Sequence, residues 1–304
     1  MAAYKILIPL DGSRLAERSL SYLRALKDLD DEQVELMSVA DVDEDYRGLS
    51  EENAKDREIN VLRGYLKETA EKAKSAFGIE AGTRVVGGSP ADAILREAQD
   101  YNPNLIVIAT HGRSGLSRWR FGSVADKVIR GGNHNTLVIG PKAADNDIWT
   151  DDPTPPSFKT ILVPLDGSEL GEAALAVAQA LATHFESAVH LVRVTPIPVV
   201  DEGMGGAGMA SADLMDSMVE GAKQYLAEAA GRFTAPGGVK TEVLIGPAAS
   251  GLEDYIDANG VDVVVMTSHG RSGVARLALG SVTDRLLGSG KAPVLVVRSV
   301  AKTS

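Results

Sequence analysis

Two short stretches combine glycine, histidine, arginine and serine in the same order after a β-type apolar run. They are His111-Gly-Arg-Ser-Gly115 and His269-Gly-Arg-Ser-Gly273, and each leads to a Gly-Ser pair that opens a helical pattern, Gly122-Ser123 and Gly280-Ser281. A strand, a glycine loop and a helix N-terminus favour phosphate, because exposed N–H groups and the positive helix end attract anions. A polar turn before a serine-capped helix is the alternative. The agreement of two copies favours phosphate.

Composition limits the function classes. The chain has 304 residues, 44% of them apolar and 24% charged, which predicts a soluble protein with room for two domains. A net charge of −11 argues against a general nucleic-acid binder and against anionic membrane surfaces. Without cysteine there is no disulfide and no thiolate chemistry. No signal peptide or membrane-spanning run is apparent, so we expect the cytoplasm.

Apolar strand patterns alternate with helical patterns through the first half of the chain. The expected strands lie at 4–10, 34–39, 83–86, 105–109 and 136–139, and the expected helices at 15–26, 50–77, 89–98 and 123–130. Strands separated by helices imply parallel pairing with right-handed crossovers. The sequence therefore predicts a doubly wound α/β domain.

The second half repeats the first. Ile161–Ser168 repeats Ile6–Ser13, 155 positions later, whereas the histidine loops are 158 positions apart. The second copy thus gains three residues, which we place within Pro196–Ala212, where the glycine-rich Gly203–Met209 lies. We interpret this stretch as a tolerated insertion rather than a lid over the site. We predict a first domain at 1–142, a linker at 143–157 and a second domain at 158–304. The linker is rich in Pro and Asp and is expected to be exposed and fairly stiff.

The chemistry belongs at the strand ends, because doubly wound sheets bind ligands where the strand order reverses. The first and fourth strands end at Asp11 and at Thr110-His111-Gly112. If these strands are neighbours, Asp11 and the glycine loop face one crevice. The carboxylate would accept from an adenine amino group or a ribose hydroxyl, and the loop amides would hold phosphate. Asp11 as a helix N-cap is an equal alternative, and the two roles are compatible. Asp166 is the counterpart in the second copy.

The loop spacing and the first strand end together resemble a known family. The loops read Ala109-x2-Gly112-x9-Gly122-Ser123 and Thr267-x2-Gly270-x9-Gly280-Ser281, and both copies open with Pro-Leu-Asp-Gly-Ser. At these residues the chain resembles the universal stress protein family in its tandem form, whose nucleotide signature is Gly-x2-Gly-x9-Gly-(Ser/Thr). The resemblance covers everything except the linker and the termini. Both copies depart from the signature at its first glycine.

The resemblance implies two five-stranded parallel sheets in the order 3-2-1-4-5 with helices on both faces. It further implies ATP or a related adenine nucleotide, with or without Mg²⁺, and a role in stress tolerance. Pairing of the two domains through their fifth strands is expected, and a homodimer is a further option. The implied nucleotide-binding residues are Asp11, Val39, Ala109, His111, Gly112, Arg113, Gly122, Ser123 and Val124 in copy one, and Asp166, Val194, Thr267, His269, Gly270, Arg271, Gly280, Ser281 and Val282 in copy two.

Other residues give weaker signals. The five histidines show no metal-ligand spacing, and no catalytic triad, carboxylate pair or Gly-x4-Gly-Lys loop is present, so no catalytic or metal residue is predicted. Nearby arginines would either screen phosphate or lie on the surface: Arg113, Arg118, Arg120, Arg271 and Arg276. We therefore expect a nucleotide-binding stress or signalling protein without efficient turnover. The alternatives are an interaction scaffold with degenerate sites and a slow ATP-hydrolysing enzyme of the same fold.

Overall fold

The computed structural model describes most of both copies. The described residues are 4–26, 32–40, 51–110, 122–140, 148–149, 156–197, 199–201, 207–209, 212–268 and 279–298. The chain forms two compact units, Met1–Ser157 and Phe158–Ser304.

The first unit alternates strands and helices as the sequence predicts. Its elements are β1 (Lys5–Pro9), α1 (Arg14–Glu17), α2 (Ser19–Leu26), β2 (Gln33–Ala40), α3 (Glu51–Phe77), β3 (Ala81–Gly87), α4 (Pro90–Tyr101), β4 (Leu105–Ala109), α5 (Ser123–Gly131) and β5 (Asn135–Ile139). The strands are parallel in the order β3-β2-β1-β4-β5, which confirms the predicted order. The single helix expected over 15–26 is wrong, because the chain breaks it into α1 and α2.

The second unit repeats this order. Its elements are β6 (Thr160–Pro164), α6 (Glu169–Phe185), β7 (Ala188–Thr195), β8 (Val199–Asp201), β9 (Ala207–Met209), α7 (Ala212–Gly231), β10 (Val239–Ile245), α8 (Ala248–Asn259), β11 (Val263–Thr267), α9 (Ser281–Ser289) and β12 (Val294–Val297). The parallel strands run β10-β7-β6-β11-β12. The inserted stretch includes the antiparallel pair β8–β9, which the sequence did not predict.

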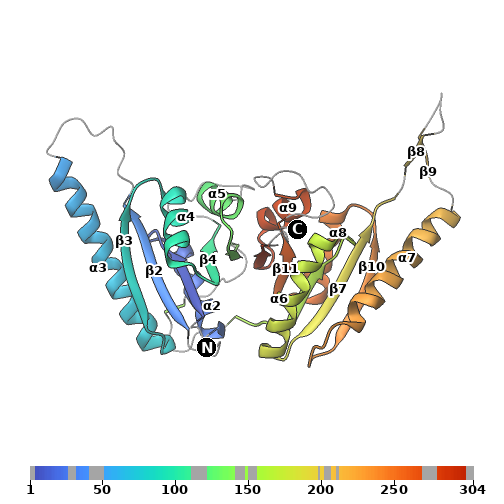
Figure 1. The fold of residues 1–304 in the computed structure, drawn as a ribbon, viewed down its shortest axis with the longest axis horizontal. Helices are drawn as coiled ribbons and strands as arrows, with labels where there is room; N and C mark the ends of the chain where they lie inside the picture. The colour runs from blue at the N-terminus through green and yellow to red at the C-terminus, as the bar shows by residue number, and fades with distance from the viewer. Residues whose placement is uncertain are drawn as a thin grey trace. The chain divides into compact units, whose positions relative to one another are not determined.

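Helices cover both faces of each sheet. In the first unit α1, α2 and α3 lie on one face and α4 and α5 on the other; in the second, α6 and α7 lie opposite α8 and α9 (Figure 1). The central strands are therefore buried on both faces, and Ile106, Val107, Val264 and Val265 have no exposed surface. Continuous apolar strands of this kind are typical of parallel sheets. Each core fixes the strand ends from which the polar loops leave.

Two residues of the predicted linker pack onto the first unit. Ile148 is only 5% exposed, and the Trp149 ring stacks on Phe77 with 5.8 Å between ring centroids. The expectation of an exposed linker is therefore wrong at Ile148 and Trp149, because both side chains find apolar surface on the first unit.

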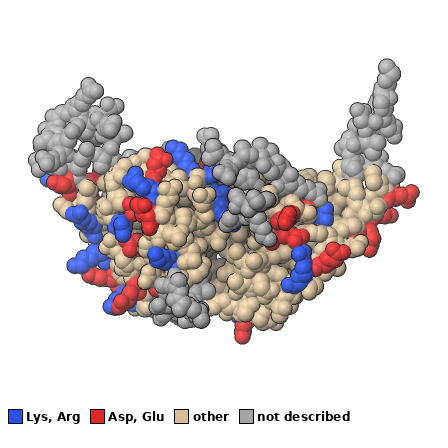
Figure 2. Space-filling view, in the orientation of Figure 1, with Lys and Arg blue, Asp and Glu red and all other residues tan. Residues whose placement is uncertain are grey.

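Charges are mixed over the described surface. On the face shown in Figure 2, cationic and anionic side chains are interspersed over the helices of the first unit rather than gathered by sign. One such pair is Lys72–Glu68 at 2.7 Å on α3. In the part of the chain that the structure describes, no helix is both long and apolar enough to cross a membrane.

We predict opposite stability effects for alanine at two glycines of the second unit. A Cβ at Gly237 would lie 2.4 Å from the backbone nitrogen of Ala188, so Gly237→Ala should lower the free energy of unfolding by about 1–3 kcal/mol through overpacking. Gly221 is exposed on α7 with open space around it, so Gly221→Ala should raise it by roughly 0.5–1 kcal/mol. Urea unfolding of both variants measures the difference, and equal effects would contradict this account of the Gly237 turn.

Candidate functional site

The strand ends of the second unit enclose a cavity of about 300 Å³. Its floor is made by β6 and β11, which are direct neighbours in the sheet. From β6 the chain runs on to β7 on one side, whereas β11 and β12 lie on the other. The cavity therefore lies where the strand order reverses, which is the ligand position of doubly wound sheets.

The turn after β6 supplies the acidic wall. Oδ1 of Asp166 accepts hydrogen bonds from the backbone N–H of Ser168 at 2.9 Å and from its hydroxyl at 2.6 Å. Ser168 Oγ in turn accepts from the N–H of Gly171 at 3.0 Å and so caps α6. In the first unit Asp11 and Ser13 form the same turn, and Ser13 caps α1. The alternative in which Asp11 is the helix cap is therefore wrong.

The N-terminus of α9 faces the cavity across from this turn. Gly280 occupies the N-cap position with φ −61°, and no side chain caps the helix there. Its N–H donates to Ser268 O at 2.9 Å, which joins the helix start to the end of β11. The first-turn N–H groups thus belong to Ser281, Val282 and Thr283, all of which line the cavity. Because these groups lack intrahelical partners, they suit an anion.

Apolar side chains form the remaining wall. Val192 and Val194 come from β7, Leu252 from α8 and Met266 from β11. The sequence predicted Val194, but it gave no signal for Leu252, because a helix packing against its own sheet is not visible in a local pattern. Gly171 was missed as well. A Cβ there would lie 2.7 Å from Asp166 Oδ1, so glycine keeps the carboxylate in place.

Two arginines support the strand ends of the second unit. The guanidinium of Arg193 lies 4.9 Å from the Tyr225 ring centroid and next to Gly167 in the acidic turn. Burial, followed by the charge of Glu172, raises the pKa of Tyr225 to about 12. Arg298 donates to Ser268 Oγ at 3.2 Å, and burial lowers the pKa of its guanidinium. Neither arginine was predicted from the sequence.

The predicted site residues of the second copy therefore converge where the structure describes them. Asp166, Val194, Thr267, Gly280 and the pair Ser281-Val282 all line the one cavity. His269, Gly270 and Arg271 lie outside the described residues, as does Arg276. That the described residues contact a nucleotide stays a prediction.

The first copy places its residues on equivalent elements. Asp11 follows β1, Val39 lies near the end of β2, Ala109 ends β4, and Gly122 is the N-cap of α5 with Ser123 and Val124 in the first turn. Gly122 has φ −61° and no side-chain cap, as at Gly280. Serine capping of these two helices is therefore wrong. His111, Gly112 and Arg113, with Arg118 and Arg120, lie outside the described residues.

The universal stress protein family matches the chain twice, over residues 3–140 and 157–298. The chain belongs to the universal stress protein family. Its tandem form is confirmed by the two matches.

Individual relatives agree with this assignment. Universal stress protein MJ0531 of Methanocaldococcus jannaschii is 30% identical over 148 residues, 48% of this chain and 85% of the relative. Universal stress protein Rv2005c of Mycobacterium tuberculosis is 27% identical over 239 residues, 74% of this chain and 73% of the relative. The crystal structure of a universal stress protein from Archaeoglobus fulgidus shares the fold at a TM-score of 0.70 and 19% identity, covering 98% of this chain and 99% of that one.

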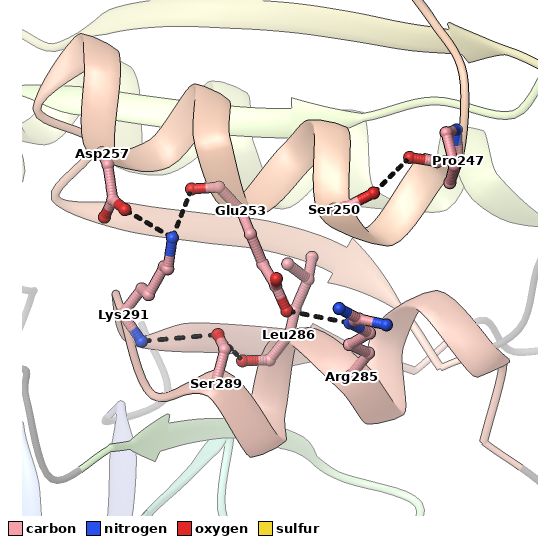
Figure 3. Close-up of polar contacts among 8 residues, drawn as sticks. All are labelled: Pro247, Ser250, Glu253, Asp257, Arg285, Leu286, Ser289 and Lys291. Atoms are coloured by element: carbon pink, nitrogen blue, oxygen red, sulfur yellow. Dashed lines mark hydrogen bonds and ion pairs between the residues drawn. The ribbon is translucent and has the colours of Figure 1, made fainter.

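The two universal stress domains hold α5 and α9 by different contacts. In the second, Arg285 on α9 pairs with Glu253 on α8 at 3.2 Å, and Lys291 bonds to the Glu253 carbonyl at 3.1 Å and to Asp257 (Figure 3). In the first, Leu95 occupies the position of Glu253 and packs onto Gly131, where a Cβ would lie 2.8 Å from the Leu95 methyl. The second domain uses charges where the first uses apolar contact.

We predict that Thr283 anchors the start of α9. Thr283 is 3% exposed, and its hydroxyl donates a hydrogen bond to the Thr267 carbonyl at 3.2 Å. Thr283→Val keeps the shape and removes this bond, so the free energy of unfolding of the second domain should fall by about 0.5–1.5 kcal/mol. Urea unfolding checks this value, with Ser250→Ala as control because Ser250 is partly exposed and its hydroxyl donates to Pro247 O at the start of its own helix. No loss beyond the control would show that the bond does not anchor α9.

Proposed function

We propose that this protein binds an adenine nucleotide, ATP or a close relative, in the second-domain cavity and at the equivalent place in the first domain. One observation carries the proposal: a single cavity joins an apolar wall, the Asp166 carboxylate and the uncapped N-terminus of α9. A nucleotide matches these three features, because it has a flat base, hydroxyl and amino donors, and phosphates. The volume falls at the lower end of ligand pockets, roughly 300–1,000 Å³.

Each wall has a chemical counterpart in the nucleotide. Val192, Val194 and Leu252 offer apolar surface to a base, and Asp166 offers an acceptor to an amino group or a ribose hydroxyl. The α9 N-terminus offers N–H donors and positive potential to phosphate. A carboxylate next to the phosphates would repel them, so the placement of Asp166 across from α9 fits this division. Mg²⁺ stays an expectation.

We further propose that binding occurs without efficient turnover. Among the described cavity-lining residues Asp166 is the only titratable side chain, and its Oδ1 already accepts two hydrogen bonds from Ser168. A general base for water needs a basic nitrogen or oxygen atom within hydrogen-bond reach of that water. ATP incubated with the protein should therefore disappear more slowly than about 1 s⁻¹. Faster hydrolysis would support the enzyme alternative.

The biological role follows the family. We propose a stress or signalling role in which nucleotide occupancy is the signal, with pairing of the two domains through their fifth strands as a further expectation. The scaffold with degenerate sites is separated from this role by mass spectrometry of protein denatured directly after purification. A released adenine nucleotide supports the binding role. A preparation without any, which also fails to take up added ATP, favours the scaffold.

We predict that the first site binds ATP more tightly than the second, by about five- to thirtyfold. Ala109 adds a methyl where the family has glycine, whereas Thr267 adds a branched side chain to the cavity wall. Gly280→Glu should block site two without unfolding it, because a Cβ there lies 3.6 Å from Ser268 O, an ordinary contact. Gly122→Glu should block site one, since Gly122 has the same backbone conformation. Calorimetry assigns the tighter site, and its loss in Gly280→Glu alone would reverse the order.

We predict that ATP affinity changes less than tenfold between pH 8 and pH 6. The proposed contacts to the nucleotide are backbone N–H groups, arginines and hydroxyls, which do not titrate in this range, whereas a required neutral histidine would protonate near its usual pKa of about 6.5. Calorimetry at both pH values measures the change. A larger loss at pH 6 would assign an essential role to His111 or His269, and His111→Asn and His269→Asn would locate it.

A further inference from the structure

The segment that connects the two domains forms a hydrogen bond, through Trp149, with one charged residue of the first domain. Nε1 of Trp149 donates a hydrogen bond to Oε2 of Glu17 at 2.7 Å, across 132 positions of sequence. The ring stacks on Phe77, and the neighbouring Ile148 is 5% exposed. An indole N–H can only donate, and a short bond to a carboxylate is among the stronger hydrogen bonds in proteins. Trp149 is therefore held in place both by apolar contact and by a directional hydrogen bond, an arrangement that we call the seat of Trp149.

In the second domain, a residue of the domain itself donates to the corresponding glutamate. Glu172 is the counterpart of Glu17, and its Oε2 accepts a hydrogen bond at 3.0 Å from Arg232, the residue that follows α7. The residue of α3 that corresponds to Arg232 is Lys72. Lys72 pairs instead with Glu68 on its own helix at 2.7 Å and lies 5.8 Å from the Trp149 ring centroid. Its hydrogen bond to Glu68, and to a smaller extent the nearby charge of Glu17, raise the pKa of Lys72. In the first domain the hydrogen-bond donor to this glutamate therefore comes from the connecting segment, whereas in the second domain it comes from the domain itself.

The partner of Trp149 is tied to the acidic turn. Glu17 is the last residue of α1, its N–H donates to Ser13 O at 3.1 Å, and Ser13 N–H donates to Asp11 Oδ1 at 3.0 Å. The second oxygen of Glu17 accepts from the Tyr65 hydroxyl at 3.0 Å. Burial, then the charges of Glu17 and Asp11, raise the pKa of Tyr65, so this phenol stays a donor at neutral pH. One Glu17 oxygen therefore ties α1 to Tyr65 of α3, and the other ties α1 to Trp149, which stacks on Phe77 at the end of α3.

We propose that Trp149 is a positioning residue of the first nucleotide site, delivered by the segment that connects the two domains. It holds Glu17, Glu17 holds the short helix α1, and α1 holds the turn that presents Asp11. This inference rests on the proposed nucleotide binding. Its consequence is reciprocal coupling: ATP that engages the Asp11 turn tightens the seat of Trp149, and loss of Trp149 weakens ATP at the first site.

The test uses the full chain with one tryptophan. The chain has two, Trp119 and Trp149, so Trp119→Phe leaves Trp149 as the only reporter, once its ATP affinity has been compared with that of the parent. Acrylamide quenching should show a shielded Trp149 without nucleotide. In the Gly280→Glu background ATP should lower the quenching constant further, and in the Gly122→Glu background it should not. A fold support without a positioning role would not respond to ATP at one site only.

Affinity measurements complete the test. In the Gly280→Glu background, Trp149→Phe keeps the stacked ring and removes the Nε1 donor, and should weaken ATP binding by about three- to tenfold, the size of coupling within a hydrogen-bonded network. Trp149→His, which retains a ring N–H donor, should recover part of this loss. The matched control is Arg232→Met, which breaks the equivalent pair in the second domain and should leave the first site unchanged.

Each outcome decides between the claims. A Trp149 as quenchable as free tryptophan would overturn the seat itself. A shielded Trp149 with unchanged ATP affinity in Trp149→Phe, and no response to ATP, would overturn the positioning role while nucleotide binding stands. Failure of the parent protein to bind ATP at either site would sink the proposed function, and the positioning role with it, although the shielding would still show the docked segment.

Discussion

The site depends on one constraint of parallel sheets, namely that all strand C-termini lie at the same edge. Where the order reverses between β6 and β11, helices α6 and α7 leave to one face and α8 and α9 to the other. The gap between them cannot be closed by a crossover, so it remains a cavity lined by strand ends and one helix N-terminus. Every polar group of the candidate site is placed by this reversal, and the repeated copy inherits the same geometry.

The two copies share their strand order but differ in the contacts that hold their helices together. Strand order and glycine caps are the same in both copies. The contact between α4 and α5 is apolar at Leu95, whereas α8 and α9 are joined through Glu253 and Arg285. Arg285 keeps 61% of its side chain exposed, so solvent and salt screen this pair and it adds little net stability. Apolar packing therefore remains the main contribution to holding these helices together in both domains.

Much of the fold was predictable because its signals are local. Buried strands read as apolar runs, glycines mark the loops, and the repeat doubled each signal, so the strand order followed once the family was recognised. The convergence of Asp166 and Gly280 was predictable from the reversal rule, and the position of Val194 from the family resemblance. Leu252 was not, because the face that a helix turns to its own sheet is indistinguishable from any other apolar stripe. The seat of Trp149 was hidden for a further reason: its partner Glu17 lies 132 positions away, and the segment around it is rich in the residues of exposed linkers.

Small side-chain differences near the two acidic turns have opposite effects on the room left for a ligand. Thr267 narrows the second cavity, yet Gly171 beside Asp166 carries no side chain, and its counterpart in the first domain is Ala16. The methyl of Ala16 belongs to a residue that is 5% exposed, so it packs into the fold and takes little room from a ligand. Thr267 lies on the cavity wall itself. We therefore still expect tighter binding at the first site. The proposed positioning role of Trp149 adds to this expectation, because it holds α1, which in the second domain is replaced by the 17-residue helix α6. A long helix buried along its length needs no external clamp, whereas the four-residue α1 does.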